Sequence, residues 1–473
     1  MRDLARLRHL HRWELLDLRA VAVLALAVAC HGGAAAPPVD ADPAPVLTAA
    51  DKAALAALSP ASLPAPMADV TNRFADNPAA AALGKKLFMD AAFSGKLLDS
   101  DNDGTGDTLG KQGETGKVSC ASCHNPLKSF ADFRVVSNQR SISLASDWNV
   151  RHTPSLLDVG QARLLMWDGR RDALFNQPFG PIENPTEMNS SRLFLAEQIA
   201  ARYANDYAEV FGALPDLSGL PQIAAADTGC TKPAQGTPVC HGKPGDGAEY
   251  DSLSTAQQDA VTRIAANFGK ALGAYERLLT CGQSAFDSWV AAGAVDTSGS
   301  DAGNGLSHSA QRGAQLFVGK AGCTACHAGP YMTDQQFHNV GLRPAKVAVA
   351  FIDLDDHGAY PGLTAALADP LNSKGVYSDG DDGRLTAPDQ GKTDGAFRTP
   401  GLRCVSGRPS WMHTGQFTQL VDVVAFFSTG GFTGGFPGTN ELAALNLTAQ
   451  EQADLVAFLT SLQGPGPATG LLQ

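Results

Sequence analysis

The sequence predicts an all-α protein made of two similar domains with long loops, which arose by duplication. Apolar residues recur at helical spacing in several segments, and no long run alternates as a half-buried strand would. The pattern Cys-x-x-Cys-His occurs at residues 120–124 and again at 323–327, each time after a segment that ends in Leu-Phe. The chain of 473 residues is also too long for one compact core. We therefore expect one domain over residues 69–300 and another over residues 301–473.

The amino-terminal segment has the features of an export signal. Five arginines precede a short apolar run at residues 20–29, which is too short to cross a bilayer as a helix. The run ends in Ala-Val-Ala-Cys, which predicts a lipoprotein signal over residues 1–30 with lipidation of Cys30. Plain secretion, with cleavage near Ala29, is the alternative. A Pro/Ala-rich linker is expected over residues 31–68. The protein is thus predicted to be periplasmic and attached to the membrane through Cys30.

Each Cys-x-x-Cys-His pattern follows a predicted helix. The segment LGKKLF, residues 83–88, precedes the first pattern, and RGAQLF, residues 312–317, precedes the second. A third helix is predicted from an apolar stripe made of Val261, Ile264, Phe268, Leu272, Tyr275 and Leu279. Near the end of the chain, Thr448 and Glu451 form a capping box. The helix that follows would bury Leu455, Phe458, Leu459 and Leu462.

The repeated Cys-x-x-Cys-His pattern is typical of covalent haem attachment. Two thiols three positions apart on a helical turn can both add to the vinyl groups of one haem, and the next histidine then lies under the iron. The composition predicts roughly 0.004 such patterns in this chain, so two copies are not an accident. A zinc site would favour four closed ligands without strict Cys-His adjacency, and a thioredoxin-like motif would need a neighbouring βαβ pattern.

We therefore expect two covalently bound haem c groups in two cytochrome c-like domains. The first haem would be held by Cys120, Cys123 and His124, and the second by Cys323, Cys326 and His327. Both histidines would be ligands of haem iron.

The remaining cysteines suit an oxidising compartment. Apart from Cys30 and the four haem cysteines, an even number is left, as disulfides require. Cys230 and Cys240 bracket a turn-rich loop and are expected to pair, which contributes roughly 3 kcal/mol in the chain-entropy model. Cys281 and Cys404 either form a second disulfide or are two buried free thiols, and the sequence does not decide between these alternatives.

An acidic loop precedes the first haem pattern. Asp99, Asp101 and Asp103 alternate and Gly104 follows, as in the first half of a calcium loop. The twelfth position is Gly110, where an EF-hand needs a bidentate Glu. The loop is therefore a candidate calcium site, and a solvated acidic loop is the alternative.

The net charge of −12, with no basic stretch, argues against nucleic acid as a partner and permits a positively charged protein partner.

The residues after the first haem pattern resemble the bacterial di-haem cytochrome c peroxidases, a family that includes the MauG-type enzymes. The resemblance covers most of residues 80–464. It is carried by WDGR (167–170), GPIENPTEMN (180–189), QFHNVGL (336–342), FRTPGLR (397–403) and WMHTGQFTQLVDVV (411–424).

The resemblance implies a role for several residues. Trp167 matches a tryptophan between the two haems that assists electron transfer, and Glu187 matches the distal acid over the N-terminal haem. Gln177 and Pro181 match residues that line that distal pocket, and His124 and His327 match the proximal ligands. A carboxylate in that place suits peroxide cleavage, because a proton must move from the near oxygen to the far one.

The chain also departs from the family pattern. Family members that need reductive activation have a distal histidine in a loop that here falls near Arg140. The nearby His152 occupies the position of an asparagine that helps to hold an inter-haem calcium, which puts that calcium in doubt. The family's sixth ligand of the C-terminal haem, Met or Tyr, falls near Phe427, which cannot bind iron. Met412 is our candidate for this ligand, and its alternative role is packing. His413 and His338 are expected to have a structural role or to contact the iron ligands without binding iron themselves.

The resemblance implies a peroxidase that reduces hydrogen peroxide to water at the N-terminal haem. Electrons would enter at the C-terminal haem from a small cytochrome c or a copper protein. One alternative is a MauG-like enzyme that oxidises residues of a partner protein. The other is an electron-transfer cytochrome without catalysis, which would have no use for Glu187.

Overall fold

The computed structural model describes residues 43–136, 142–233, 235–294, 305–343 and 355–473. The predicted signal segment with Cys30, and the Arg140 position, lie outside these residues. Within the described ranges, no helix is long and apolar enough to span a membrane.

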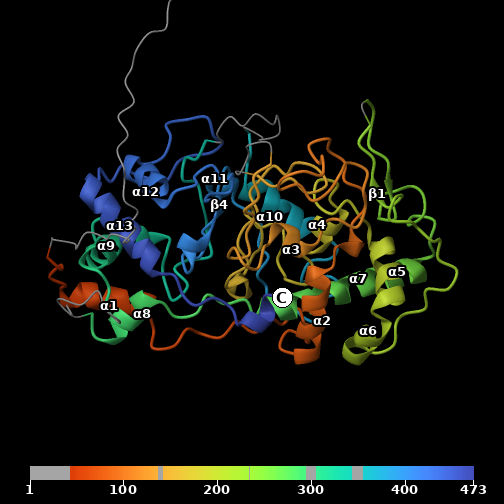
Figure 1. The fold of residues 1–473 in the computed structure, drawn as a ribbon, viewed down its shortest axis with the longest axis horizontal. Coiled ribbons are helices and arrows are strands. Elements are labelled where there is room, and N and C mark those ends of the chain that lie inside the picture. Colours follow the sequence, from red (N-terminus) through yellow and green to blue (C-terminus); the bar gives the residue numbers. More distant parts are fainter. Residues whose placement is uncertain (1–42, 137–141, 234, 295–304, 344–354) are drawn as a thin grey trace, which may run out of the picture. The chain divides into compact units, whose positions relative to one another are not determined.

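The described chain is mostly helical, and long loops join the helices (Figure 1). The α-helices are α1 (Ala49–Leu58), α2 (Pro78–Met89), α3 (Cys120–Cys123), α4 (Phe179–Glu183), α5 (Arg192–Arg202), α6 (Ala204–Phe211), α7 (Thr255–Glu276), α8 (Ala285–Ala291), α9 (His308–Val318), α10 (Ala359–Ala368), α11 (Gln390–Thr393), α12 (Leu420–Thr429) and α13 (Ala449–Ser461). Short 3₁₀ turns are η1 (Ala91–Phe93), η2 (Val159–Gln161), η3 (Cys323–Ala325), η4 (Val405–Gly407) and η5 (Thr469–Leu471). The predicted helical class is confirmed.

Strands are confined, in the part of the chain described, to two antiparallel pairs of two residues each. Strand β1 (Gly229–Cys230) pairs with β2 (Cys240–His241), so that Cys230 lies opposite Cys240. Strand β3 (Phe337–His338) pairs with β4 (Phe397–Arg398), so that Phe337 lies opposite Arg398. The second pair brings together two of the segments that carry the family resemblance.

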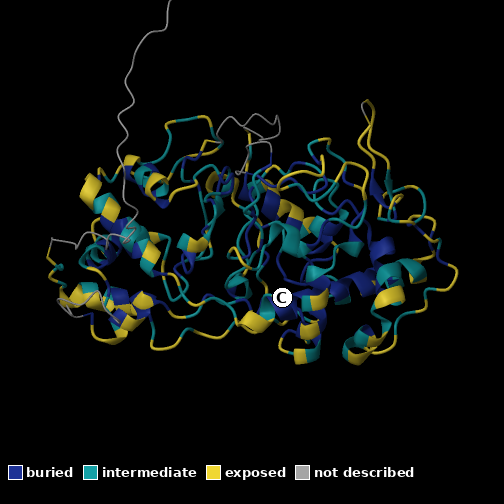
Figure 2. Cartoon of the chain, in the orientation of Figure 1, coloured by how far each residue is buried: buried dark blue, intermediate teal, exposed yellow. Residues whose placement is uncertain are grey.

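Apolar side chains form two main clusters. The first is built largely from α2, α5 and α7, and includes Phe88, Phe268 and Tyr275. Figure 2 shows α7 as one of the most buried elements, which agrees with the apolar stripe in its sequence. The second cluster takes residues from α1, α8, α9, α12 and α13, including Phe317 and Phe458. The division at residue 300 stays a prediction.

Helix α1 corrects one sequence-based expectation. A linker was expected through residue 68, but residues 49–58 form a helix that begins with a capping box between Thr48 and Asp51. Leu55 and Leu58 are fully buried in the second apolar cluster. The linker prediction is therefore wrong for this stretch, because two leucines one turn apart give the Ala-rich segment an apolar face to bury.

Each of the two predicted helices that end in Leu-Phe contains a glycine at the point where it crosses another helix. Helix α2 packs on α7, and α9 packs on α13 (Figure 1). A Cβ on Gly84 would lie 1.9 Å from the carbonyl oxygen of Ala271, and one on Gly313 would lie 1.9 Å from that of Asp454. Both glycines thus permit the close approach of two helices, at equivalent places in LGKKLF and RGAQLF. This likeness supports the predicted duplication.

Two disulfides join the cysteines that lie outside the haem patterns. Cys230 pairs with Cys240, as the sequence predicts. Cys281 pairs with Cys404, which decides between the two possibilities left open for that pair. The second bond joins residues 123 positions apart, so it closes a long loop. In the chain-entropy model a loop of that length contributes about 4–5 kcal/mol.

Candidate haem sites and active site

The two predicted proximal histidines are held by the same local interaction. His124 Nδ1 lies 3.1 Å from the carbonyl oxygen of Phe130, and His327 Nδ1 lies 2.9 Å from that of Met332. A carbonyl only accepts, so each Nδ1 carries the proton and each Nε2 keeps its lone pair for a metal. Burial lowers the pKa of both imidazoles, which favours the neutral form that binds iron.

The haem patterns themselves form short helical turns. In α3, Ser119 and Ser122 make a capping box, and the His124 N–H donates to the carbonyl of Cys120 at 2.8 Å. In the second pattern, the His327 N–H donates to the carbonyl of Cys323 at 2.9 Å. Each histidine therefore lies one turn after the first cysteine of its pattern.

A cavity of about 470 Å³ adjoins the first pattern. Its walls include every residue that the sequence assigns to the N-terminal haem site: Cys120, Cys123, His124, Trp167, Gln177, Pro181 and Glu187. The structure therefore brings together residues that lie up to 67 positions apart, from Cys120 to Glu187.

Glu187 lies in the wall of this first cavity, in the loop after α4. The side-chain amide of Asn184 donates to Glu187 Oε1 at 2.8 Å. The Glu187 carbonyl accepts from the N–H of Ser146 at 3.0 Å, which fixes the backbone of the loop. Burial raises the pKa of Glu187, and Arg170, Asn184 and Arg171 oppose that rise. Such a carboxyl group is suited to accept and return a proton.

A second cavity, of about 640 Å³, adjoins the second pattern. Its walls include Cys323, Cys326, His327, His338, Met412, His413 and Phe427. Met412 has a φ of 70°, in the left-handed region that non-glycine residues rarely adopt. The candidate sixth ligand thus lies at the expected cavity, together with the phenylalanine that occupies the family's ligand position.

Trp167 lines both cavities. Its indole N–H donates to the carbonyl of His152 at 2.7 Å, and its own carbonyl accepts from the backbone N–H of Arg398 at 2.8 Å. His152 is buried, lines both cavities as well, and lies with its Nε2 3.0 Å from Ser410 Oγ. Trp167 is therefore held in place at the region that the two cavities share.

Comparison with known proteins decides the family. A family model described as di-haem cytochrome c peroxidase matches residues 78–230. The chain is 30% identical to the cytochrome-c peroxidase IdrP1 of Denitromonas iodatirespirans, over 90% of this chain and 92% of that protein. The chain belongs to the di-haem cytochrome c peroxidase family. It is therefore an oxidoreductase of the peroxidase type, and the family implies two c-type haems.

Other relatives of this di-haem peroxidase agree with that assignment. It is 27% identical to the methylamine utilization protein MauG of Methylorubrum extorquens, over 95% of this chain and 97% of that one. Its fold is similar to the diheme peroxidase BthA from Burkholderia thailandensis E264, with a TM-score of 0.56 and 23% identity over 85% and 90% of the two chains. The likeness shows that a solved diheme peroxidase has a similar fold.

The residues around both cavities of this di-haem peroxidase fit a haem. The cysteines of both patterns are free of disulfides, and burial raises the pKa of the Cys123 and Cys323 thiols to about 12, which disfavours thiolate redox chemistry. Arg408 lines the second cavity, and its buried Nε has no hydrogen-bond partner in the described structure. The carboxylates of a haem would supply the missing acceptor.

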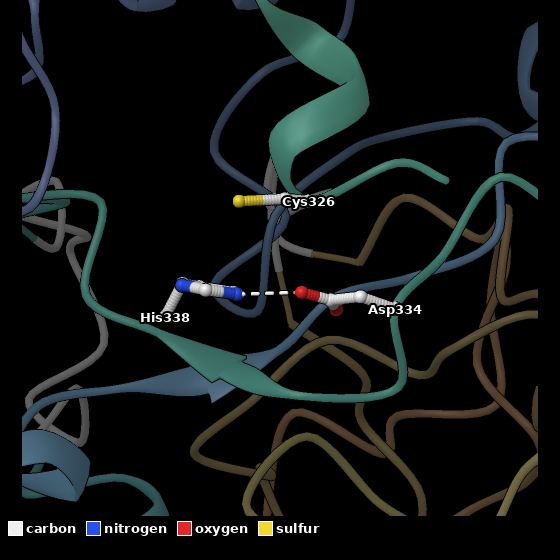
Figure 3. Close-up of side chains that lie close together, drawn as sticks. All are labelled: Cys326, Asp334 and His338. Atoms are coloured by element: carbon white, nitrogen blue, oxygen red, sulfur yellow. Dashed lines mark hydrogen bonds and ion pairs between the residues drawn. The ribbon is translucent and has the colours of Figure 1, made fainter.

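One cluster near the second site has the composition of a metal centre. Cys326, Asp334 and His338 lie close together, as Figure 3 shows. His338 Nε2 is 2.8 Å from an Asp334 oxygen, and Nδ1 is 2.7 Å from a Glu441 oxygen. The pKa of His338 is raised to about 10, mainly by the Cys326 thiol and then by the carboxylates of Glu441 and Asp334. If Cys326 attaches the haem, as the sequence predicts, Asp334 and His338 alone offer too few ligands for a separate metal site.

His413, the residue that follows Met412, packs against an aromatic ring. The His413 ring stacks on Phe397 with a centroid distance of 3.5 Å. Burial lowers the pKa of His413 to about 3, so the ring stays neutral. This agrees with the structural role expected from the sequence.

The carboxylates of the candidate calcium loop are not brought together. Asp99 pairs with Lys232 at 2.6 Å, Asp101 accepts from the Trp148 indole at 2.9 Å, and Asp103 accepts from Thr105. In the residues that the structure describes, these three do not form a metal-binding group. The geometry gives the calcium prediction no support, and the alternative of an acidic loop with its own partners fits better.

Sequence reasoning missed two residues that matter for the sites. Asn184 orients Glu187, and Arg398 lines both cavities. Asn184 could have been noticed, because Asn before Pro favours the start of a turn. In the sequence N-P-T-E, such a turn brings the Asn184 side chain close to the carboxylate of Glu187, three residues later. Arg398 carries no such local signal, because its importance depends on where β4 lies.

Proposed function

We propose that this protein reduces hydrogen peroxide to water at the N-terminal haem site, with electrons that enter at the C-terminal site from a small cytochrome c or a copper protein. One observation carries the proposal. The cavity with Cys120, Cys123 and His124 also holds the acid Glu187, and Trp167 lines both that cavity and the next.

The chain's own residues would perform the proton chemistry. Reduction of one peroxide consumes two electrons and two protons and yields two water molecules. A haem bound through Cys120 and Cys123, with His124 as ligand, would supply the iron that binds peroxide. Glu187 would accept a proton from the nearer oxygen and return it to the departing oxygen, an effect typically worth about 10²–10⁴-fold in rate. Asn184 would hold the carboxylate in place for both transfers.

Trp167 would assist electron transfer between the sites. Trp167 lines both cavities, and its indole N–H is held by the His152 carbonyl. At the second site Met412 would serve as the sixth ligand, and a thioether ligand raises the reduction potential of haem iron, which suits a site that receives electrons. Phe427 would then have a packing role.

The proposed location is the periplasm, with a lipid anchor at Cys30. The disulfides Cys230–Cys240 and Cys281–Cys404 support an oxidising compartment. The anchor rests on the sequence alone.

We also propose that the chain consists of two domains, residues 69–300 and 301–473, which arose by duplication. The glycines at equivalent helix crossings, Gly84 and Gly313, support this division.

A second candidate function is oxidation of residues in a partner protein. The identity of 27% to a MauG along nearly the whole chain favours it. An electron carrier without catalysis is the third possibility, but a cavity that places a buried acid beside the haem pattern argues against it.

The test is a turnover assay of the protein with both haems bound. Reduced small cytochrome c is mixed with hydrogen peroxide and enzyme, and both reactants are followed. We expect two donor molecules to be oxidised for each peroxide consumed. Peroxide consumption that needs a partner protein instead of the donor would favour the MauG-like function. A protein that exchanges electrons with the donor but leaves peroxide intact would be a carrier, and the proposal would be wrong.

A further inference from the structure

Arg398 has an unusual position in the molecule. It belongs to β4 and lines both cavities. Its backbone N–H donates to the Trp167 carbonyl at 2.8 Å, and its Nε donates to the Met166 carbonyl at 3.3 Å. These two bonds anchor the residue beside the tryptophan and leave the terminal nitrogens of the guanidinium without a protein acceptor in the described structure.

Four other arginines near the sites are paired with carboxylates, whereas Arg408, which lines only the second cavity, has no carboxylate partner among the described residues. The pairs are Arg151 with Asp168 and Asp356, Arg170 with Asp168, Arg171 with Asp369, and Arg403 with Asp287. Arg398 has no such pair among the described residues, and burial lowers its pKa to about 10 without an opposing charge. The side chain of Arg398 is partly buried at the cavity walls, and a cation that loses water there without gaining an anion is costly. An anion from a bound group is therefore expected at this place.

A haem brings the anions that this position lacks, because each haem carries two propionate carboxylates. Bidentate pairing of guanidinium with carboxylate is the geometry that arginine favours. Arg398 lines both cavities, so its guanidinium would be available to a carboxylate of a haem bound in either one.

We propose that Arg398 is a cation shared by the two haem sites, which pairs with haem carboxylates and favours the reduced state at both. The physical reason is that reduction removes one positive charge from the iron centre, so a nearby cation stabilises the reduced form. Through its backbone bond, the same residue fixes Trp167 between the sites. This inference deepens the proposed function and rests on the binding of two haems.

The test compares reduction potentials of variants with both haems bound, measured by spectroelectrochemical titration without peroxide. Arg398→Met should lower the equilibrium constant for reduction of each haem by about tenfold. For a one-electron couple, this lowers each reduction potential by about 59 mV. Arg408→Met is the matched control, because Arg408 lines only the second cavity and should affect only the C-terminal haem. Arg398→Lys keeps the charge and should restore most of both potentials.

Haem content and circular dichroism show whether each variant is folded. If Arg398→Met loses its haems, Arg398→Gln replaces it, because the amide can still donate to the Met166 carbonyl while the charge is absent. A neutral variant that shifts one potential or neither overturns the inference. Peroxide turnover is scored separately: shifted potentials in a protein without peroxidase activity would refute the proposed function and leave the shared cation intact.

Discussion

Replacement of Glu187 by Gln should slow peroxide turnover by about 10²-fold or more. The amide has the size of the carboxyl group and can keep a hydrogen bond with Asn184, whose side chain lies 2.8 Å from Oε1. What it loses is the ability to accept a proton. General acid–base catalysis is typically worth about 10²–10⁴-fold, or about 3–5 kcal/mol of barrier, so the loss should fall in this range.

The pH profile gives a sharper version of the same prediction. Burial raises the pKa of Glu187 above its ordinary value of 4.5. The ionised form, which accepts the proton, is therefore lost as pH falls through that raised pKa. Wild-type turnover should decline on the acid side with a midpoint above 4.5, and the Glu187→Gln profile should lack this decline.

The assay is stopped-flow and steady-state peroxide reduction from pH 5 to pH 8, with haem spectra recorded for each variant. Glu276→Gln is the matched control, because Glu276 lies in the wall of the same cavity and has no part in the proposed chemistry. Burial raises the pKa of Glu276 to about 8, so it is mostly neutral at pH 7, and its amide should retain wild-type turnover there. A Glu187→Gln enzyme as fast as wild type would refute the reasoning.

Four further predictions follow from the same account. Trp167→Phe should slow the supply of electrons from the second site while the initial reaction with peroxide keeps its rate; equal loss of both phases would contradict this. Gly313→Ala places a Cβ 1.9 Å from a carbonyl oxygen and should lower the free energy of unfolding by about 3 kcal/mol, whereas Gly434→Ala, in open space, should leave it unchanged in thermal unfolding. The oxidised resting protein should show a high-spin component in its electron paramagnetic resonance spectrum and react at once with peroxide, because no histidine occupies the family's distal position; a wholly low-spin, inert haem would mean that His152 or another residue binds it. Cys30→Ser should release the protein from membranes into the soluble periplasmic fraction, and wild type that is soluble without detergent would rule out the anchor.

Features with a local cause could be predicted from the sequence. The haem patterns, the stripe of α7 and the capping box of α13 each lie within one helix or one turn, so their spacing alone carries the information. The position of Glu187 was predicted through the family resemblance, and the cavity around it agrees with that prediction.

Features that depend on distant partners could not be predicted. Lys232 reaches the acidic loop from the Cys230–Cys240 segment and uses a carboxylate that the pattern assigned to calcium. The pairing of Cys281 with Cys404, and the placement of Arg398 at both cavities, arise from chain segments far apart in sequence. Only tertiary structure brings such groups together.

The central claim is that this chain couples two haems to peroxide reduction, and titration of the fully reduced protein with hydrogen peroxide tests it most directly. Each ferrous haem holds one electron to donate, and one peroxide takes two. We predict that one equivalent of peroxide per chain rapidly oxidises both haems, with a sharp end point in the optical spectrum. If the haems stay reduced, or are oxidised only slowly by a large excess of peroxide, the account is contradicted.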